Sequence, residues 1–267
     1  MGIVEALILG ALQGITEFLP VSSSGHLVLL QRILGIREPA LLFDTLVHGG
    51  TLAAGFVVLR RDIGRILCRP LQPLTGLLIA ATIPTVIIAL IFKDPIEGAF
   101  ASGAWLGFAF LTTACALALS EFAAKKPGTP RPGTAMNWLD ALIIGILQGV
   151  AIIPGVSRSG LTLSGAISRR LDRDFAARFS FLLSIPAILG ALVFQLKDLV
   201  RGGGGSGAGI GPDALIAGTA AAAVVGFFSV RFMLKLVRSR SLRGFAVYTA
   251  LLGILVLFDQ HISHVFF

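Results

Sequence analysis

Charged residues are scarce in this sequence. Asp, Glu, Lys and Arg make up 13% of its 267 residues, while hydrophobic residues make up 55% and the mean hydropathy is +0.89. Soluble globular domains carry about 25% charged residues, so this composition excludes an ordinary soluble globule. We therefore expect the chain to fold within a lipid bilayer.

Cysteine is also nearly absent. Cys68 and Cys115 are the two cysteines of the chain, and they fit no metal-ligand spacing. A disulfide framework and a zinc site are therefore not expected. The N-terminus lacks a basic leader and a cleavage site, and its first apolar run contains Glu5 and Glu17. We therefore do not expect a signal peptide.

Acidic residues are outnumbered by basic ones, 14 to 22, which gives a net charge of +8. In a soluble protein such an excess would suggest a nucleic-acid partner. Here the cations occupy the loops between apolar runs, which is the pattern of positive-inside sorting. We therefore expect no nucleic-acid partner, and we expect the basic loops to face water and anionic membrane lipids.

Long apolar runs dominate the rest of the chain. A helix that crosses a hydrocarbon core of about 30 Å needs roughly 20 apolar residues. Six runs approach this length, and the last of them is short: 40–59, 73–92, 104–121, 175–196, 214–234 and 245–258. These runs predict six transmembrane helices.

One stretch of the sequence occurs twice. Residues 6–25 read ALILGALQGITEFLPVSSSG and residues 141–160 read ALIIGILQGVAIIPGVSRSG, so a shift of 135 positions superposes them. Each copy is an apolar run, a proline and a small hydroxyl-rich loop. The copies differ at three informative pairs of positions: Glu17 and Ile152, Ser23 and Arg158, His26 and Leu161. The duplication is therefore structural, while the chemistry is divided between the halves.

Neither copy is expected to cross the membrane. The run 2–18 is followed by Pro20 and then by an arm, 27–35, of about nine residues, which is too short to span. In the second copy, a re-entrant hairpin over 138–170 keeps the following arginines on the side of the other basic loops. The sequence thus predicts an all-α integral membrane fold, with six transmembrane helices plus two oppositely inserted re-entrant helical hairpins in an inverted-topology repeat.

The basic residues also predict the side on which each loop lies. Sixteen of the 22 fall in 60–69, 125–131, 169–178 and 231–243, which we place in the cytoplasm, whereas five lie outside and Arg158 lies in the membrane. Both termini and the loop 197–213 are then periplasmic. We expect one membrane domain over residues 1–267, composed of repeat 1 (1–121), a linker (122–137) and repeat 2 (138–267).

Polar residues gather around the two loops of the repeat. They are Gln13, Glu17, Ser22, Ser23, Ser24 and His26 in the first copy, and Ser157, Arg158, Ser159 and Thr162 in the second. Such groups at membrane depth are costly and indicate a functional site. Short helices expected to begin near residues 26 and 161 would offer N–H groups and a positive dipole end, which together with an arginine suit phosphate oxygens. A glutamate and a histidine beside them suit proton transfer or metal assistance.

Several of these residues also have a structural interpretation. Gln13 and Gln148 would each form an interhelical hydrogen bond. Ser22 and Ser157 would cap the short helices. Glu17 and Arg158 would form a structural ion pair. His48 either hydrogen-bonds within the helix bundle or joins the site. Residues expected to serve packing or the interfaces are Gly10, Gly14, Gly145 and Gly149 in close helix contacts, Asp44, Glu121 and Asp140 at span ends, and Trp105, Trp138 and Tyr248 near the headgroups.

Three motifs carry a resemblance to a known family. They are QGITEFLPVSSSGH over 13–26, PGVSRSG over 154–160 and FDTLVHGGTLAA over 43–54. At these motifs, and in length and repeat layout, the chain closely resembles the undecaprenyl-pyrophosphate phosphatase family, which comprises bacterial membrane enzymes linked to bacitracin resistance. The resemblance implies hydrolysis of undecaprenyl pyrophosphate to undecaprenyl phosphate and phosphate, a reaction that recycles the lipid carrier for peptidoglycan synthesis.

The resemblance also implies roles for individual residues. The catalytic residues would be Glu17, Ser23, His26 and Arg158, and the substrate-binding residues would be Gln13, Ser22, Ser24, Gly25, Ser157, Ser159 and Thr162. A divalent cation, Mg²⁺ or Ca²⁺, would lie at Glu17 with Gln13, although a glutamine at the first position weakens a two-carboxylate site. The protein would be a multi-pass protein of the bacterial inner membrane, with the site near the midplane and open to the periplasm, and a homodimer is left open.

Two rival functions are weighed against the phosphatase. A secondary transporter or lipid flippase is suggested by inverted repeats with broken helices, but it would not need a Ser–His–Glu cluster. An intramembrane serine protease is weaker, because Ser23 and His26 lie only three residues apart and no oxyanion geometry is visible. Within the phosphatase interpretation, the spacing favours attack by Ser23, with His26 handling the proton and Glu17 positioning the nucleophile; direct attack by water is the alternative.

Overall fold

The structure, a computed structural model, describes residues 1–36, 40–92, 103–125, 127–200 and 210–266. The regular secondary structure of these residues is helical, apart from one isolated β-bridge between Arg131 and Leu171. In chain order the helices are α1 (Ile3–Thr16), α2 (Ser23–Ile33), α3 (Leu41–Val58), α4 (Arg60–Cys68), α5 (Pro73–Ile91), α7 (Leu106–Ala124), η1 (Gly133–Ala135), α8 (Trp138–Val150), α9 (Arg158–Ser168), α10 (Arg173–Val200), α11 (Pro212–Ser239), α12 (Arg243–Phe258) and η2 (Asp259–Ser263).

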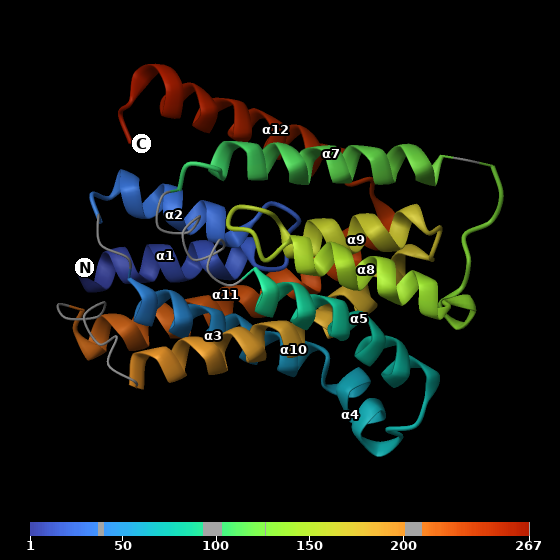
Figure 1. Ribbon diagram of the computed structural model, residues 1–267. Helices are drawn as coiled ribbons and strands as arrows, with labels where there is room; N and C mark the ends of the chain where they lie inside the picture. The colour runs from blue at the N-terminus through green and yellow to red at the C-terminus, as the bar shows by residue number, and fades with distance from the viewer. Residues whose placement is uncertain (37–39, 93–102, 126, 201–209, 267) are drawn as a thin grey trace.

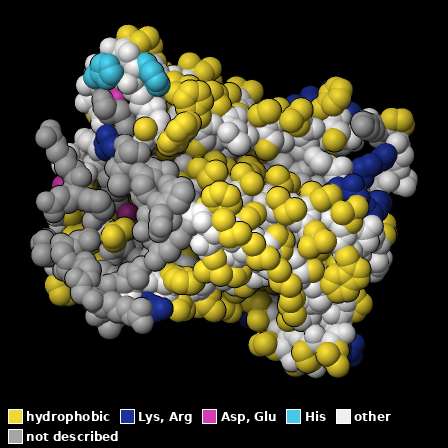
Figure 2. Space-filling view, in the orientation of Figure 1, with side chains coloured by type: hydrophobic (Ala, Val, Ile, Leu, Met, Phe, Trp, Pro, Cys, Tyr) yellow, Lys and Arg dark blue, Asp and Glu magenta, His cyan; other side chains and the backbone are white. Residues whose placement is uncertain are grey.

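Six of these helices are long and apolar enough to cross a membrane. They are α3, α5, α7, α10, α11 and α12, and they coincide with the six predicted runs to within a few residues. Their outward side chains are largely hydrophobic, as Figure 2 shows for one face of the molecule. The protein is therefore a multi-pass membrane protein, and the prediction of six transmembrane helices is confirmed.

Four short helices form two pairs that meet in the middle of the molecule. Helices α1 and α8 have 14 and 13 residues, so each is only about 20 Å long, less than the hydrocarbon thickness. Figure 1 shows α1 and α2 in one half of the molecule and α8 and α9 in the other, with their connecting segments facing each other. The segments touch directly, because the Ser159 hydroxyl donates to the Leu19 carbonyl (2.8 Å) and the Gly155 amide donates to the Ser24 hydroxyl (3.2 Å).

A serine begins the second helix of each pair. The Ser22 hydroxyl accepts from the Gly25 amide (3.2 Å), and the Ser157 hydroxyl accepts from the Gly160 amide (3.0 Å). The capping interpretation of both serines is thereby confirmed. Helices α2 and α9 begin at Ser23 and Arg158, three residues before the expected starts near 26 and 161, because the cap lies at the serine.

Close backbone approach fixes the first helix of each pair against a long helix. A Cβ atom added at Gly10 of α1 would lie 2.1 Å from the Gly218 carbonyl oxygen of α11, and one added at Gly145 of α8 would lie 2.1 Å from the Ala81 carbonyl oxygen of α5. No side chain larger than hydrogen fits at that distance. The expected role of these glycines in close helix packing is confirmed.

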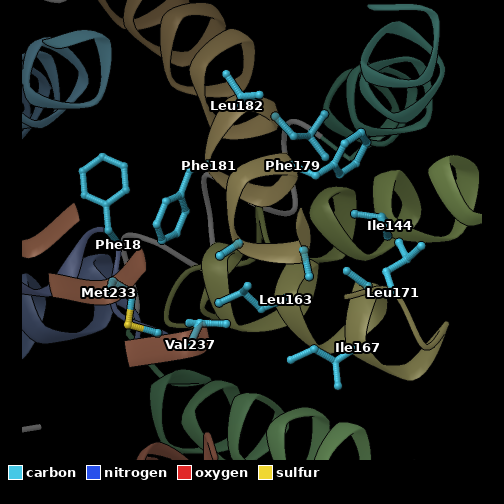
Figure 3. Close-up of a cluster of buried hydrophobic side chains, with 14 of the residues drawn as sticks. Phe18, Ile144, Leu163, Ile167, Leu171, Phe179, Phe181, Leu182, Met233 and Val237 are labelled. Atoms are coloured by element: carbon cyan, nitrogen blue, oxygen red, sulfur yellow. The ribbon is translucent and has the colours of Figure 1, made fainter. Parts of the chain in front are cut away.

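A hydrophobic core holds the first connecting segment in place. Phe18 packs edge-on against Phe181 of α10, with ring centroids 5.4 Å apart. Figure 3 shows these rings beside Leu163 of α9 and Met233 of α11. Because Phe18 follows Glu17 directly, this packing also determines where the Glu17 carboxylate lies.

One end of the molecule carries many basic residues, and three arginines there form ion pairs with buried carboxylates. Lys and Arg side chains gather at the end where α4 and the α7–α8 connection lie, whereas both termini lie at the opposite end (Figures 1 and 2). Asp140, fully buried, accepts from Arg131 (2.9 Å) and Arg169 (2.6 Å). Burial raises the pKa of Asp140, but hydrogen bonds from Arg131, Asn137 and Arg169 outweigh burial and hold this pKa below its usual value.

Two of the carboxylates predicted at span ends, Glu121 and Asp140, are therefore shielded from solvent. Glu121 is 4% exposed and accepts from Arg173 (2.9 Å) and from the Leu242 amide (2.9 Å). Asp140 ties the α7–α8 connection to α9, and Glu121 ties α7 to α10 and to the start of α12. The expectation that the basic loops are simple solvated faces is wrong for these arginines, because each has a buried carboxylate partner.

We predict that Gly10→Ala and Gly145→Ala each lower the free energy of unfolding by about 1–3 kcal/mol, the usual cost of overpacking. The added methyl group must push a carbonyl oxygen away. Thermal or denaturant unfolding in detergent measures the effect. Gly190→Ala is the matched control, because nothing lies within 4 Å of its Cβ position, and it should be neutral or slightly stabilising. Equal stability of all three variants would contradict the close packing.

Candidate active site

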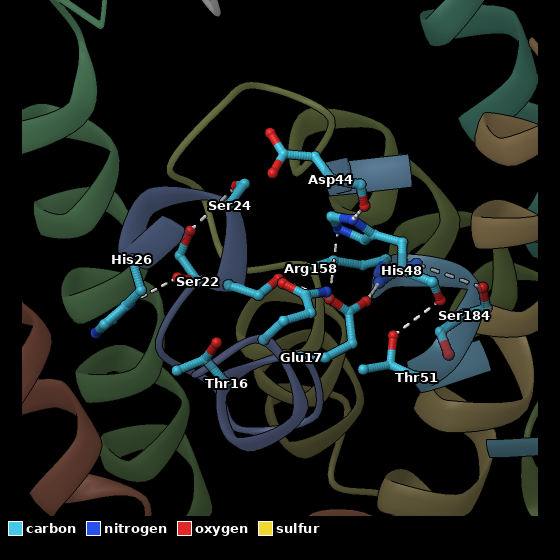
Figure 4. A network of polar contacts seen from close by, with 12 residues as sticks. Thr16, Glu17, Ser22, Ser24, His26, Asp44, His48, Thr51, Arg158 and Ser184 are labelled. Carbon is cyan, nitrogen blue, oxygen red and sulfur yellow. Dashed lines mark hydrogen bonds and ion pairs between the residues drawn. The ribbon is translucent and has the colours of Figure 1, made fainter. Parts of the chain in front are cut away.

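Glu17 is at the centre of the region where the two connecting segments meet. Its side chain is fully buried, and it follows the last residue of α1. One carboxylate oxygen, Oε2, accepts from Gln13 Nε2 (2.7 Å) and from the Ser23 hydroxyl (2.7 Å). The other, Oε1, pairs with the guanidinium of Arg158. Figure 4 shows Glu17 beside Arg158.

Arg158 reaches Glu17 from the other half of the chain. It is the first residue of α9, and its second amino group, Nη1, donates to the Ser184 carbonyl of α10 (3.3 Å). Its side chain is 21% exposed. The ion pair considered from the sequence is therefore formed. Arg158 and Ser23 contact the two different oxygens of the same carboxylate.

Ser23 is the loop serine that contacts the carboxylate. Its hydroxyl donates to Glu17 Oε2, whereas Ser22 caps α2 and Ser24 accepts from Gly155. A hydroxyl that donates to a buried carboxylate is arranged to lose its proton to that carboxylate. The predicted convergence of Glu17 and Ser23 is confirmed.

Two helix N-termini face the same region. Helix α2 starts at Ser23 and runs toward one end of the molecule, and α9 starts at Arg158 and runs toward the other (Figure 1). The positive ends of both helix dipoles, with their amide N–H groups, are thus directed at the space beside Arg158. This combination attracts an anion with several oxygen atoms, such as a phosphate group.

His26 does not join this network. Its Nδ1 lies 2.6 Å from the Ser22 carbonyl oxygen, and its Nε2 lies 2.8 Å from the hydroxyl of Tyr248 on α12, against which the ring stacks. Figure 4 shows the imidazole pointing away from Glu17. Residue 26 lies about 60° further round α2 than residue 23, which turns the ring toward α7 and α12. The expected convergence of His26 with Ser23 and Glu17 is therefore not found, and the catalytic role of His26 stays a prediction.

Two residues beside the site were not among the predicted site residues. His48 of α3 lies with Nε2 3.7 Å from Glu17 Oε2, and the signal available for it was its place in the FDTLVHGG segment. Tyr248 was expected near the headgroups, but its hydroxyl holds His26. Nothing in the sequence links Tyr248 to a residue 222 positions away.

The remaining predicted residues lie around the two segments in structural positions. Gly25 packs against Phe110, the Ser157 amide donates to Thr113 (2.9 Å), and Thr162 contacts Ser180. Ser24 and Ser159 connect the segments as described above. Substrate binding by these residues stays a prediction.

The two repeated glutamines have different roles. Gln13 supports Glu17 within α1, as the spacing of four residues predicts. Gln148 donates to Thr85 of α5 (3.3 Å), which is the interhelical hydrogen bond expected of it. The duplication therefore preserves the residue type, and only the first copy faces the carboxylate.

The side chains around Glu17 do not form a cation site as they are arranged. Both carboxylate oxygens accept from hydrogen-bond donors, and Gln13 turns its amide N–H toward Glu17, not its carbonyl oxygen. Hard divalent cations need several oxygen ligands. Among the described residues no three His, Cys, Asp or Glu side chains cluster. The donor set in this arrangement therefore does not fit Mg²⁺ or Ca²⁺. The divalent cation expected from the family resemblance stays a prediction.

The fold and the site define a class: a multi-pass membrane protein with a buried Ser–Glu–Arg centre between two helix N-termini. Residues 6–255 match the family described as bacitracin resistance protein BacA, and the chain belongs to this family. Three similar proteins are the undecaprenyl-diphosphatase of Carboxydothermus hydrogenoformans, 49% identical over 97% of this chain and 98% of its own; undecaprenyl-diphosphatase 4 of Bacillus thuringiensis strain Al Hakam, 41% identical over the whole of both chains; and the undecaprenyl-diphosphatase of Methanosphaera stadtmanae, 38% identical over 96% and 98%.

We predict that Glu17→Gln lowers the free energy of unfolding by about 3 kcal/mol, because removal of one partner leaves a buried charge unpaired. Arg158→Gln should have a similar effect. The double variant should cost less than the sum, because both charges are then gone. Arg65→Gln is the control, since its pair with Asp62 is 76% exposed on the arginine side and should contribute no more than about 1 kcal/mol. Additive losses in the cycle would show that the two groups do not interact.

Proposed function

We propose that this protein is an undecaprenyl-diphosphatase, which hydrolyses undecaprenyl diphosphate to undecaprenyl phosphate and inorganic phosphate. One observation carries the proposal: a serine hydroxyl and an arginine from the two halves of the chain meet at one buried carboxylate. The names of the similar proteins support it. In a bacterial membrane this reaction would return the lipid carrier to peptidoglycan synthesis and underlie bacitracin resistance.

The diphosphate would bind between the two connecting segments. Arg158 offers a planar guanidinium that can contact two phosphate oxygens at once. The N-termini of α2 and α9 would stabilise further negative charge on the terminal phosphate. As Arg158 turns toward the phosphate, the Glu17 carboxylate loses part of its ion pair and becomes a better proton acceptor for Ser23.

The reaction then proceeds by attack of Ser23 on the terminal phosphorus. The Ser23 proton passes to Glu17 Oε2, 2.7 Å away, while the new O–P bond forms. The bond from phosphorus to the bridging oxygen breaks, and that oxygen leaves with undecaprenyl phosphate. Water then hydrolyses the phosphoserine, which releases phosphate and restores the serine. Direct attack by water on the diphosphate, with Ser23 as a hydrogen-bond donor, is the competing route.

The prenyl chain would lie in an apolar groove of about 510 Å³ on the flank of the helix bundle. The groove is lined by side chains of α3, α4, α5 and α10, including Ile83, Leu182, Ile185 and Pro186. Its α10 wall adjoins Ser184, whose carbonyl accepts from Arg158. A lipid with its diphosphate at Arg158 could therefore place its hydrocarbon against this wall.

We further propose that the two short helix pairs are oppositely inserted re-entrant hairpins in an inverted-topology repeat, 1–121 and 138–267 with the linker 122–137. Equivalent contacts support this arrangement. Gly10 of α1 meets α11 as Gly145 of α8 meets α5, and α11 and α5 occupy equivalent places in the two halves. Likewise α2 contacts α12 through Tyr248, and α9 contacts α7 through Thr113.

The termini and the loop 197–213 would be periplasmic, and the site would open on that side. The distribution of basic residues supports this orientation. A chain of polar contacts supports an opening on this side. It leads from Glu17 through His48 and Asp44 to Gln31, whose amide donates to Asp44 (2.8 Å). A homodimer stays a prediction.

The decisive measurement of activity is phosphate release from undecaprenyl diphosphate by the purified protein in detergent, without any gradient. We predict release by the wild type. Ser23→Ala should abolish turnover if Ser23 is the nucleophile, whereas loss of one donor should cost only about 10²- to 10³-fold. Rapid quench with terminally labelled substrate should trap phosphoserine. Ser239→Ala, at the exposed end of α11, should match the wild type.

Two results would contradict these assignments. A wild type that transports the lipid but releases no phosphate would favour the transporter or flippase. Release by Ser23→Ala above about one part in a thousand, with no trapped label, would favour direct attack by water.

The orientation is tested with two cysteine reporters. Cys68 of α4 is exposed, so in a Cys115→Ser background an impermeant thiol reagent should label it only after permeabilisation. Gly2→Cys, at a position with open space around it, should label in intact cells in a background without Cys68 and Cys115. Labelling of Cys68 in intact cells would contradict the proposed sidedness.

A further inference from the structure

His48 is a titratable side chain beside Glu17, and the reaction proposed above gives it no role. It lies near the middle of α3, with Nδ1 2.7 Å from the Asp44 carbonyl oxygen and Nε2 3.7 Å from Glu17 Oε2. Its side chain is 28% exposed, whereas the side chain of Glu17 is fully buried. Figure 4 shows the ring between Asp44 and the carboxylate. His48 therefore lies between the buried carboxylate and the exposed surface of the protein.

The backbone contact fixes the tautomer of His48. A carbonyl oxygen only accepts hydrogen bonds, so Nδ1 carries the hydrogen and the neutral ring has its lone pair on Nε2. That lone pair is directed at Glu17. His26 differs, because its Nδ1 donates to the Ser22 carbonyl and its Nε2 accepts from Tyr248. Of these two histidines, His48 presents a basic nitrogen to Glu17 and His26 does not.

The charged and titratable groups around His48 are few in the described part of the chain. Glu17 faces it from the α1–α2 connection, Asp44 lies one turn before it on α3, and Arg158 of α9 reaches the far oxygen of Glu17. The facing turn of α11 presents Ala222 and neighbouring uncharged residues to α3. The facing turn of α10 contributes Ser184, which contacts Arg158 through its carbonyl. A proton on Nε2 would therefore lie beside the Glu17 carboxylate, with the Asp44 carboxylate as a second nearby negative charge.

Glu17 needs such a neighbour in the proposed reaction. It takes a proton from the nucleophile in each turnover, but its side chain has no exposed surface from which to release that proton to water. Gln13, Ser23 and Arg158 all donate to it, and none of them can pass its proton on to water. The nitrogen of His48 is the acceptor within reach.

We propose that His48 is the proton relay of this site, which carries the proton from Glu17 to solvent on the side where the termini lie. This inference rests on the proposed phosphatase function. His48 acts on the reaction through Glu17, so it is a positioning and relay residue. A separation of 3.7 Å is beyond direct hydrogen bonding, so the transfer passes through one water molecule or follows a small closure of the site.

The proton balance of the reaction is then complete. When the Ser23 oxygen bonds to phosphorus and the lipid phosphate leaves, the serine proton moves to Glu17 and on to His48, giving an imidazolium. In the second half, water attacks the phosphoserine and gives its proton to Glu17. The serine oxygen leaves and takes this proton from Glu17, whose Oε2 lies 2.7 Å away. The imidazolium releases the proton of the first half to solvent, and the net reaction consumes one water molecule.

The test is the pH profile of phosphate release by the full-length protein in detergent. In the wild type, kcat should rise with pH at the acid end of the profile, because a protonated relay cannot accept the proton from Glu17. His48→Gln should lower kcat at pH 7.5 by about 10²-fold or more, leave KM within a factor of about three, and remove this limb of the profile. His261→Gln, at an exposed position, should leave both unchanged.

Chemical rescue separates a relay from a structural role. Added imidazole should raise the activity of His48→Ala at least about tenfold, because the position is partly exposed. It should not raise the activity of His26→Ala, whose site is buried. The thermal unfolding of each variant reports whether it is folded.

A measurement without substitution at His48 covers the case in which these variants do not fold. The chain has four histidines, so His261→Gln with His264→Asn leaves His26 and His48. Diethyl pyrocarbonate should then modify His48 and inactivate the enzyme in parallel, with protection by substrate. Modification of His48 with full activity would overturn the relay.

Each other outcome also decides between a relay and its alternatives. Phosphate release that His48→Gln leaves unchanged at every pH would overturn the relay and leave the phosphatase intact. A uniform loss at every pH without imidazole rescue would reduce His48 to a support of α3. A wild type that releases no phosphate would overturn the proposed function, and the relay with it.

Discussion

The contact between Glu17 and Arg158 is the interaction on which the rest of this structure depends. A carboxylate and a guanidinium are held at membrane depth, where an unpaired charge costs several kcal/mol. The two groups come from opposite halves of the chain, so their pairing requires the α1–α2 and α8–α9 connections to meet. The glycine contacts of α1 and α8, the Phe18 packing and the serine caps all serve to bring these connections to one place.

The backbone is strained at the same point. Ser22 has φ of 72°, a conformation that costs a non-glycine residue of the order of 1–3 kcal/mol. It is held there by its cap to Gly25 and by the bond from His26 to its carbonyl. His26 therefore has a clear structural role, because it stiffens the turn that presents Ser23, while Tyr248 fixes the ring from α12. The position of Ser23 thus depends on the side chains of His26 and Tyr248, which contact the turn before it and not its hydroxyl.

Much of the fold followed from the sequence, and the site followed in part. Six spans were predictable because span length and apolarity are properties of single segments. The convergence of Glu17, Ser23 and Arg158 followed from the duplication, which places both loops in equivalent surroundings. The sequence did not predict that His48, and not His26, lies beside the Glu17 carboxylate. This arrangement depends on the rotation of α2 toward α12 and on the packing of α3 beside α1. Likewise Asp140 and Glu121 lie at helix ends as expected, but only tertiary contacts show that they are buried with arginines.

The division of the site between the two connections has a consequence for stoichiometry. Where the first copy has Glu17, Ser23 and His26, the second has Ile152, Arg158 and Leu161, so the second loop cannot serve as a reaction centre of its own. Each chain therefore contains one centre and not two, despite its internal duplication. A polypeptide made of two identical copies of either half would hold the Glu17–Ser23 pair without an arginine, or arginines without that pair. Divergence after duplication was thus a condition for this centre to exist.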